Sequence, residues 1–273
     1  MSPAEEIVRE WELPWGLTLA TAAFCAVYWR GWVAIRRTRA AQFPAWRLGC
    51  FVAGMAVLWG AIASPMDGFA DVLLSAHMVQ HLLLMSAVPP LVWLGAPVVP
   101  LLRGLPRPLV RRGLGPGLRA RWMRRVERVA TLPVVAWLLF NLTFVLWHVP
   151  RAYDFALENE PVHDFEHLCF LGSSLVFWWL VIEPWPARAG SMRWGVLAYL
   201  ITADLVNTAL SAVLAFCGRP LYGYYLTRPN PFGVSPVEDQ AMGAVIMWVV
   251  GSMVFLVPAV VLTARLLQPR RAG

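Results

Sequence analysis

Residues 70–88 of the chain read ADVLLSAHMVQHLLLMSAV, a run of 19 residues in which Asp71 alone carries a formal charge. A helix needs about 20 mostly apolar residues to cross the hydrocarbon core of a bilayer, so this run is a candidate membrane span. The whole chain has the same character, since 59% of its 273 residues are hydrophobic and only 14% are charged. Soluble domains contain about 25% charged residues. The composition therefore excludes a soluble globule, a disordered chain and a fibrous repeat, and it predicts an all-α integral membrane protein.

Seven stretches of the chain are long and apolar enough to span a membrane, so we expect one seven-helix membrane domain over 1–273. The predicted transmembrane helices are 14–34, 47–64, 70–88, 132–149, 161–183, 194–216 and 241–266. Pro89 and Pro90 should end or bend the third helix, because proline lacks a backbone donor and clashes with the preceding turn. We expect residues 91–102 to lie near the inner interface or to form a short re-entrant piece.

The distribution of arginine predicts the orientation of the helices. All 23 basic residues are Arg, and 19 of them fall in the segments on one side, against two acidic residues there, a net of +17. Nine of these Arg lie in the basic loop 103–130. The other side has a net charge of −9. The positive-inside rule therefore places the N-terminus outside and the C-terminus in the cytoplasm. We interpret the basic loop as a topology signal resting on anionic membrane lipid, and we expect no nucleic-acid partner.

Several other function classes lack support in the sequence. The acidic first 14 residues and the length of the first apolar stretch predict no cleavable signal peptide. The four Cys are scattered through apolar segments without metal-site spacing and are interpreted as core residues. There is no P-loop, no dinucleotide-binding glycine motif, no serine nucleophile elbow and no zinc-protease box. We expect no catalytic turnover.

The five histidines carry the functional prediction. Two pairs, His77/His81 and His163/His167, have the spacing H-x-x-x-H, which places both imidazoles of a pair on one helix face. Neutral imidazole binds Cu, Zn, Fe and Ni. Both pairs and His148 fall in the outer half of the predicted spans, which favours one shared metal or haem site. Buried ionisable groups in a bilayer are costly and usually mark function.

Other side chains near the histidines are candidate ligands or supports. Met85 continues the helix face of the first pair, and its thioether suits Cu(I). Asp164 and Glu166 flank the second pair and are candidates to orient its imidazoles by hydrogen bonds. For Asp204, near the middle of the sixth span, either a structural hydrogen bond or a proton role stays open.

Two outer segments have structural interpretations. Tyr222, Tyr224 and Tyr225 are interpreted as an aromatic belt at the membrane interface. Glu238 and Asp239 are interpreted as acidic residues in the first turn of the seventh helix, where they favour its macrodipole.

Three kinds of site remain in contention. A di-iron desaturase also uses H-x-x-x-H motifs, but five histidines facing outward are few for that class. A bis-His haem protein needs one His from each of two facing helices, and paired His on one face suit a small ion better. A copper site fits outward-facing His and Met, which together accommodate both copper oxidation states.

Three longer stretches carry a family resemblance. They are SPMDGFADVLLSAHMVQHLLLMSAVPPLVWLGAP (64–97), LWHVPRAYDFALENEPVHDFEHLCFLGSSLVFWW (146–179) and SPVEDQAMGAVIMWVVG (235–251). They resemble the multi-spanning CtaG family of cytochrome c oxidase assembly factors, found in the bacterial inner membrane. The resemblance implies a role in delivering copper to the oxidase copper centre, with oxidase subunits and a donor copper chaperone as partners. A copper importer or copper-resistance protein of the CopD type is the close rival. The implied metal ligands are His77, His81, His148, His163, His167 and, as a candidate, Met85.

Overall fold

The computed structural model describes residues 2–182, 193–228 and 230–267, and this part of the chain is helical without strands. The N-terminal half contains α1 Pro3–Glu10, α2 Trp15–Arg39, α3 Ala45–Ala63, α4 Met66–Ala70, α5 Leu74–Leu82, the π-helix η1 Leu83–Ala87, α6 Val88–Leu94, α7 Val98–Gly104, the π-helix η2 Leu109–Leu114, α8 Gly115–Arg119 and α9 Arg121–Ala130. The C-terminal half contains α10 Pro133–Trp147, α11 Pro150–Glu158, α12 Glu160–Ile182, α13 Arg193–Phe216, α14 Tyr224–Thr227 and α15 Pro236–Leu267. Glu183, Arg188, Arg270 and Arg271, which enter the charge balance, lie outside the described residues.

Within the described residues, six helical segments are long and apolar enough to cross a membrane. They are Trp15–Arg39, Ala45–Ala63, Leu74–Leu94, Glu160–Ile182, Trp194–Phe216 and Pro236–Ala264. These correspond to six of the seven predicted spans, and several extend beyond the predicted ends.

The predicted fourth span, 132–149, is the exception. Its helix α10 has only 15 residues, fewer than the roughly 20 that a straight crossing requires. A seventh span exists only if α9 and α10 are counted together, and these two helices meet at an angle of 73°. The break falls where Pro133 opens α10, a position at which proline needs no backbone donor.

The third span does not end at Pro89 and Pro90, so that part of the prediction was wrong. Both prolines lie in the first turn of α6, and the helical segment continues through them to Leu94. The π-helical turn Leu83–Ala87 precedes them. The predicted piece 91–102 is divided, because its first residues complete α6 and the rest begin the separate helix α7, which packs against α2.

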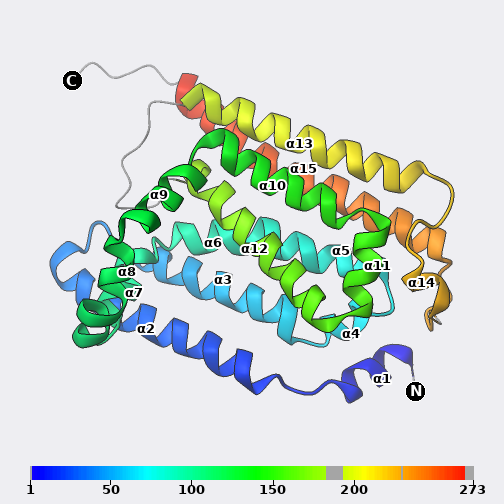
Figure 1. Cartoon of the computed structure of the whole chain (residues 1–273), viewed down its shortest axis with the longest axis horizontal. Coiled ribbons are helices and arrows are strands. Elements are labelled where there is room, and N and C mark those ends of the chain that lie inside the picture. Colours follow the sequence, from blue (N-terminus) through cyan, green and yellow to red (C-terminus); the bar gives the residue numbers. More distant parts are fainter. Residues whose placement is uncertain (1, 183–192, 229, 268–273) are drawn as a thin grey trace.

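The long helices lie side by side, and the short ones gather at the two ends of the bundle (Figure 1). Helices α4, α11 and α14 lie at one end, close to α1, whereas α7, α8 and α9 lie at the other. The histidine pairs are in α5 and in the first turns of α12, near the end that holds α4, α11 and α14. The basic helices occupy the opposite end, so the structure separates the histidines from the arginine-rich loop.

A close helix crossing joins α2 to α7. A Cβ atom on Gly31 would lie 1.8 Å from the carbonyl oxygen of Pro100, and one on Gly104 would lie 1.9 Å from that of Val27. The two backbones therefore touch at a distance that only glycine permits. Beside the crossing, the Tyr28 hydroxyl donates to the carbonyl of Gly95 across 2.6 Å and anchors the α6–α7 turn to α2.

Candidate metal centre

The two histidine pairs converge from two different helices. His77 and His81 lie on α5 and are 0% and 3% exposed, and His163 and His167 lie on the first turns of α12. The i, i+4 spacing puts each pair on one helix face. Because α5 and α12 meet with these faces together, one nitrogen from each of the four rings lies within 4.8 Å of the others.

The individual ring contacts show how compact this four-histidine cluster is. Nε2 of His77 and Nε2 of His81 are 2.7 Å apart, and the rings of His77 and His163 have centroids 5.1 Å apart. The His81 and His167 ring centroids are 5.4 Å apart. Imidazole nitrogens that share one ion lie about 2 Å from it, and therefore at most about 4 Å from one another. The cluster is within about 1 Å of that spread.

Several buried polar atoms in and beside the cluster lack a hydrogen-bond partner, as expected of atoms that could bind a cation. Nε2 of His163 and Nε2 of His167 are buried and have no hydrogen-bond partner among the described residues. Both carboxylate oxygens of Glu166, a residue only 1% exposed, lack one too. Buried polar atoms are normally paired. The lone pairs of four clustered imidazoles, with the carboxylate of Glu166 beside one of them, are donors that a transition-metal ion would satisfy.

Two neighbours of the cluster differ from their sequence interpretation. Oε1 of Glu166 lies 3.8 Å from Nε2 of His81, so this carboxylate faces the other histidine pair rather than only supporting its own. The Tyr225 hydroxyl donates to the carbonyl of Ala70 across 2.9 Å and lies 3.3 Å from Nδ1 of His77. With its proton given to Ala70, the hydroxyl accepts from Nδ1–H of His77, which leaves the lone pair of that ring on Nε2, the atom that lies 2.7 Å from Nε2 of His81.

The aromatic-belt interpretation of the tyrosines was wrong. Tyr222, Tyr224 and Tyr225 are 1%, 5% and 7% exposed, because the segment that carries them folds over the end of the bundle that holds α4 and α11. Asp154 holds this segment, since its carboxylate accepts from the backbone N–H of Gly223 at 3.0 Å and of Tyr224 at 3.1 Å. The sequence gives no spacing that links Tyr225 to His77, 148 positions away.

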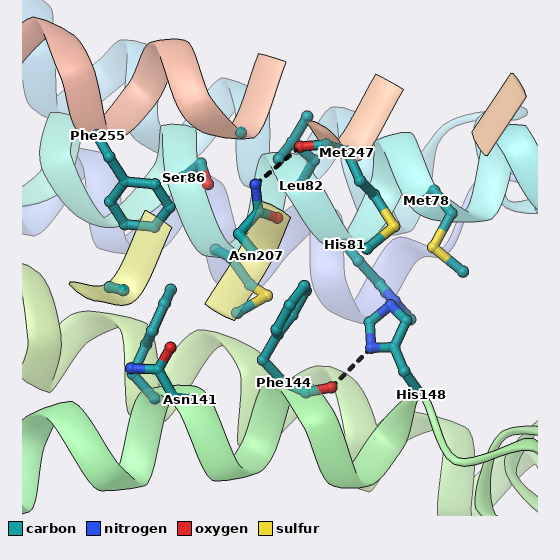
Figure 2. A pocket seen from close by; sticks show the side chains of 14 residues that line it. Met78, His81, Leu82, Ser86, Asn141, Phe144, His148, Asn207, Met247 and Phe255 are labelled. Carbon is teal, nitrogen blue, oxygen red and sulfur yellow. Dashed lines mark hydrogen bonds between the residues drawn. The ribbon is translucent and has the colours of Figure 1, made fainter. Parts of the chain in front are cut away.

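His148 and Met85 lie beside the four-histidine cluster rather than in it. The four nitrogens that meet within 4.8 Å do not include one from His148. Nδ1 of His148 donates to the carbonyl of Phe144 across 2.7 Å, and its Nε2 has no partner in the described part of the chain. His148 and Met85 both line a small cavity that His81 also lines. Figure 2 shows His81 and His148 at one end of this cavity.

An acidic vestibule borders the cluster on its other side. This cavity of about 300 Å³ is lined by His163 and His167 together with Asp67, Glu160 and Asp164. Asp67 is held in place by Gln80, whose amide donates to it across 2.9 Å. Carboxylates beside two bare imidazole nitrogens attract and concentrate cations.

Two further acidic residues have structural partners. Asp239 is buried on α15 and accepts hydrogen bonds from the N-terminus of α5 rather than only serving its own helix. Oδ1 of Asp204 accepts from the hydroxyl of Ser252 across 2.8 Å, which gives this carboxylate a structural hydrogen bond between α13 and α15.

The fold and the site define a class: a multi-pass helical membrane protein with four imidazoles close enough together to hold a metal ion. The comparison with protein families gives the particular family. Residues 26–268 match the family described as cytochrome c oxidase caa3 assembly factor (Caa3_CtaG), and the chain belongs to that family.

Curated relatives come from mycobacteria. The chain is 26% identical over 260 residues to uncharacterised proteins of Mycobacterium bovis (Mb0105), Mycobacterium tuberculosis (MT0111) and Mycobacterium leprae (ML1998). These alignments cover 90% of this chain but only 38% of each relative, so the chain spans well under half the length of these proteins. No solved structure matches the chain.

Proposed function

We propose that the protein binds copper at the four-histidine cluster and helps to deliver it to the copper centre of cytochrome c oxidase. The observation that carries this proposal is the meeting of four imidazole nitrogens from two helices within 4.8 Å. The family supplies the link to oxidase assembly. The ligands are His77, His81, His163 and His167, and the protein carries the ion without turning over a substrate.

The proposed topology places this site where an exported copper ion would reach it. We infer seven crossings of the bacterial inner membrane, with α9 and α10 together forming the bent fourth one and the N-terminus outside. The arginine-rich helices at the opposite end of the bundle support this orientation through the positive-inside rule. The acidic vestibule then opens on the outer side, toward a donor chaperone and the exposed oxidase subunit.

The compactness of the cluster favours a single ion over haem. A porphyrin between two axial histidines separates their nitrogens by about 4 Å and also needs a flat apolar slot. In this protein the space beside Nε2 of His81, where such a macrocycle would extend, is taken by Glu166 at 3.8 Å and by Nε2 of His77 at 2.7 Å. Imidazoles and one carboxylate also suit zinc, so metal selectivity is part of the test.

Copper import is the second candidate function. It is favoured by the methionine-lined cavity on the inner side of His81, since an importer needs ligands that continue from the outer cluster toward the cytoplasm. Delivery to the oxidase requires no such continuation. The same variants distinguish the two functions when oxidase activity and cytoplasmic copper are measured together.

The site is tested by metal analysis of the purified protein. We expect copper in the wild-type protein and its loss in His77→Ala/His81→Ala and in His163→Ala/His167→Ala. Met253→Leu, at an exposed position on α15, controls for copper lost during purification and should retain copper. A wild-type protein that binds no copper, or two double variants that bind as the wild type does, would refute the copper site.

The role is tested in cells that lack the protein. Delivery predicts low oxidase activity with unchanged cytoplasmic copper, restored by the wild-type chain but not by His163→Ala/His167→Ala. Normal oxidase activity with reduced cytoplasmic copper would refute delivery and establish import.

A further inference from the structure

A small cavity lies next to the four-histidine cluster, on the side that we propose faces inward. Its volume is about 30 Å³, which is room for one water-sized occupant. His81 and His148 line it at one end, and Asn141, Asn207 and the aromatic ring of Phe255 line it further inward (Figure 2). The cavity is distinct from the acidic vestibule, whose histidine lining is His163 and His167.

Three thioethers surround this cavity. Met78, Met85 and Met247 all line it and are 1%, 4% and 3% exposed. Figure 2 shows the sulfur atoms of Met78 and Met247 at the same end of the cavity as the rings of His81 and His148. Met78 comes from α5 and Met247 from α15, so two separate helices bring their sulfur atoms to one place.

His148 adds a nitrogen that is unpaired in the described structure. Its Nδ1–H is committed to the Phe144 carbonyl at 2.7 Å, which fixes the tautomer and leaves the lone pair on Nε2. That Nε2 is buried and lacks a hydrogen-bond partner among the described residues. An imidazole anchored through one nitrogen and bare at the other is the usual state of a metal-binding histidine.

We propose that this cavity is a second metal site, selective for a soft monovalent cation such as Cu(I) and held by His148 and the thioethers of Met78 and Met247. Thioether sulfur is a soft, uncharged donor that prefers Cu(I) to Zn²⁺ and other harder ions. The described residues lining the cavity carry no carboxylate, so a monovalent ion is placed there more easily than a divalent one. His81 lines this cavity and also belongs to the four-histidine cluster, which makes the two sites neighbours. The inference extends the proposed copper function one site inward.

Silver(I) is the probe, because it is a redox-inert monovalent ion that accepts the same ligands. We expect the purified full-length protein to bind two Ag(I) per chain at equilibrium dialysis and Met78→Leu/Met247→Leu to bind one. The exchange of Met for Leu conserves side-chain volume, so the packing is kept while the sulfur is removed. Met242→Leu/Met253→Leu is the matched control, since both residues are exposed on α15, and it should bind two ions. His163→Ala/His167→Ala should keep the inner ion.

X-ray absorption on the Cu(I)-loaded wild type provides a second readout that needs no variant to fold. We expect sulfur neighbours around copper, absent from Met78→Leu/Met247→Leu and retained in the control. A spectrum with nitrogen neighbours only, or two Ag(I) bound in Met78→Leu/Met247→Leu, would mean that the cavity holds a buried water only, and the inference would be wrong.

The outcomes separate this inference from the proposed function. If the wild type binds one ion, and this ion is lost in His163→Ala/His167→Ala but kept in Met78→Leu/Met247→Leu, the inner site is refuted and the four-histidine cluster is supported. If the single ion is lost in Met78→Leu/Met247→Leu but kept in His163→Ala/His167→Ala, the inner site is supported and the four-histidine cluster is refuted as the copper ligand set.

Discussion

Oδ2 of Asp239 accepts a hydrogen bond from the backbone N–H of Leu74 across 2.6 Å, although 165 positions separate the two residues. Oδ1 of the same carboxylate accepts from the backbone N–H of Ser75 at 3.1 Å and from its hydroxyl. The first N–H groups of a helix have no partner within that helix, and α5 has no side-chain cap of its own at Leu73. A residue of α15 thus caps the helix that carries His77 and His81.

We predict that Asp239→Ala lowers the free energy of unfolding by about 1–3 kcal/mol, because it leaves buried donors at the start of α5 unpaired. The variant should also weaken copper binding, since the cap sets the position of the first histidine pair. Asp239→Asn keeps one carbonyl acceptor and should lie between the wild type and Asp239→Ala. The measurements are thermal unfolding in detergent and copper affinity.

The neighbouring exposed carboxylate provides the control for this cap. Glu238 accepts from the backbone N–H of Ser235 at the start of α15, at the surface of the protein. Glu238→Ala should leave copper affinity unchanged. Equal effects of the two substitutions on copper affinity would show that the cap on α5 does not position the histidines.

Tyr225 provides a second prediction about the geometry of the site. Its hydroxyl lies between the carbonyl of Ala70 and Nδ1 of His77 and orients that ring. We predict that Tyr225→Phe reduces copper affinity about 10- to 100-fold, the usual cost of removing a group that orients a metal-binding histidine. Tyr224→Phe is the matched control, because the ring of Tyr224 faces Arg228 rather than a histidine. Competition titration with a copper chelator measures both, and an unchanged affinity in Tyr225→Phe would exclude this orienting role.

The third prediction concerns the carbonyl of Met85. Residues four and five positions later are Pro89 and Pro90, which have no N–H to donate to it. The indole Nε1 of Trp178 on α12 donates to this carbonyl across 2.9 Å instead. We predict that Trp178→Phe destabilises the protein by about 1–2 kcal/mol in thermal or denaturant unfolding. Trp122→Phe, at an exposed position on α9, should change stability little, and equal effects of the two would contradict the prediction.

The sequence predicted the parts of the fold that depend on local composition and spacing. Apolar runs of sufficient length located the helices, and i, i+4 spacing placed each histidine pair on one face, as α5 and α12 show. The continuation of the third span was missed, and the donor that satisfies the Met85 carbonyl there is Trp178, 93 positions away in the sequence. Local rules treat a proline pair as a stop, whereas a distant side chain supplies the missing hydrogen bond.

The candidate site shows the same division. The histidines could be found from the sequence, but Tyr225, the Asp239 cap and the orientation of Glu166 depend on contacts between distant segments. Aromatic residues near a membrane interface usually form a belt, and the sequence prediction followed this tendency. In the structure Tyr222 and Tyr225 are buried instead. Asp154, which holds the tyrosine segment, lies 69 positions before Gly223, and a single sequence does not reveal such a pairing.

The last prediction concerns the crossing of α2 and α7. We predict that Gly31→Ala strongly destabilises the protein, because its methyl group would overlap the carbonyl oxygen of Pro100, a backbone atom that cannot rotate away. Overpacking of this kind costs about 1–3 kcal/mol or more, and the two helices must separate to relieve it. Gly49→Ala and Gly60→Ala are the controls, since a Cβ at either position meets no atom within 4 Å. In these two variants the gain in helix propensity should leave the melting temperature unchanged or slightly raised. If Gly31→Ala has the same melting temperature as the two controls, the close approach of α2 and α7 is absent in the folded protein.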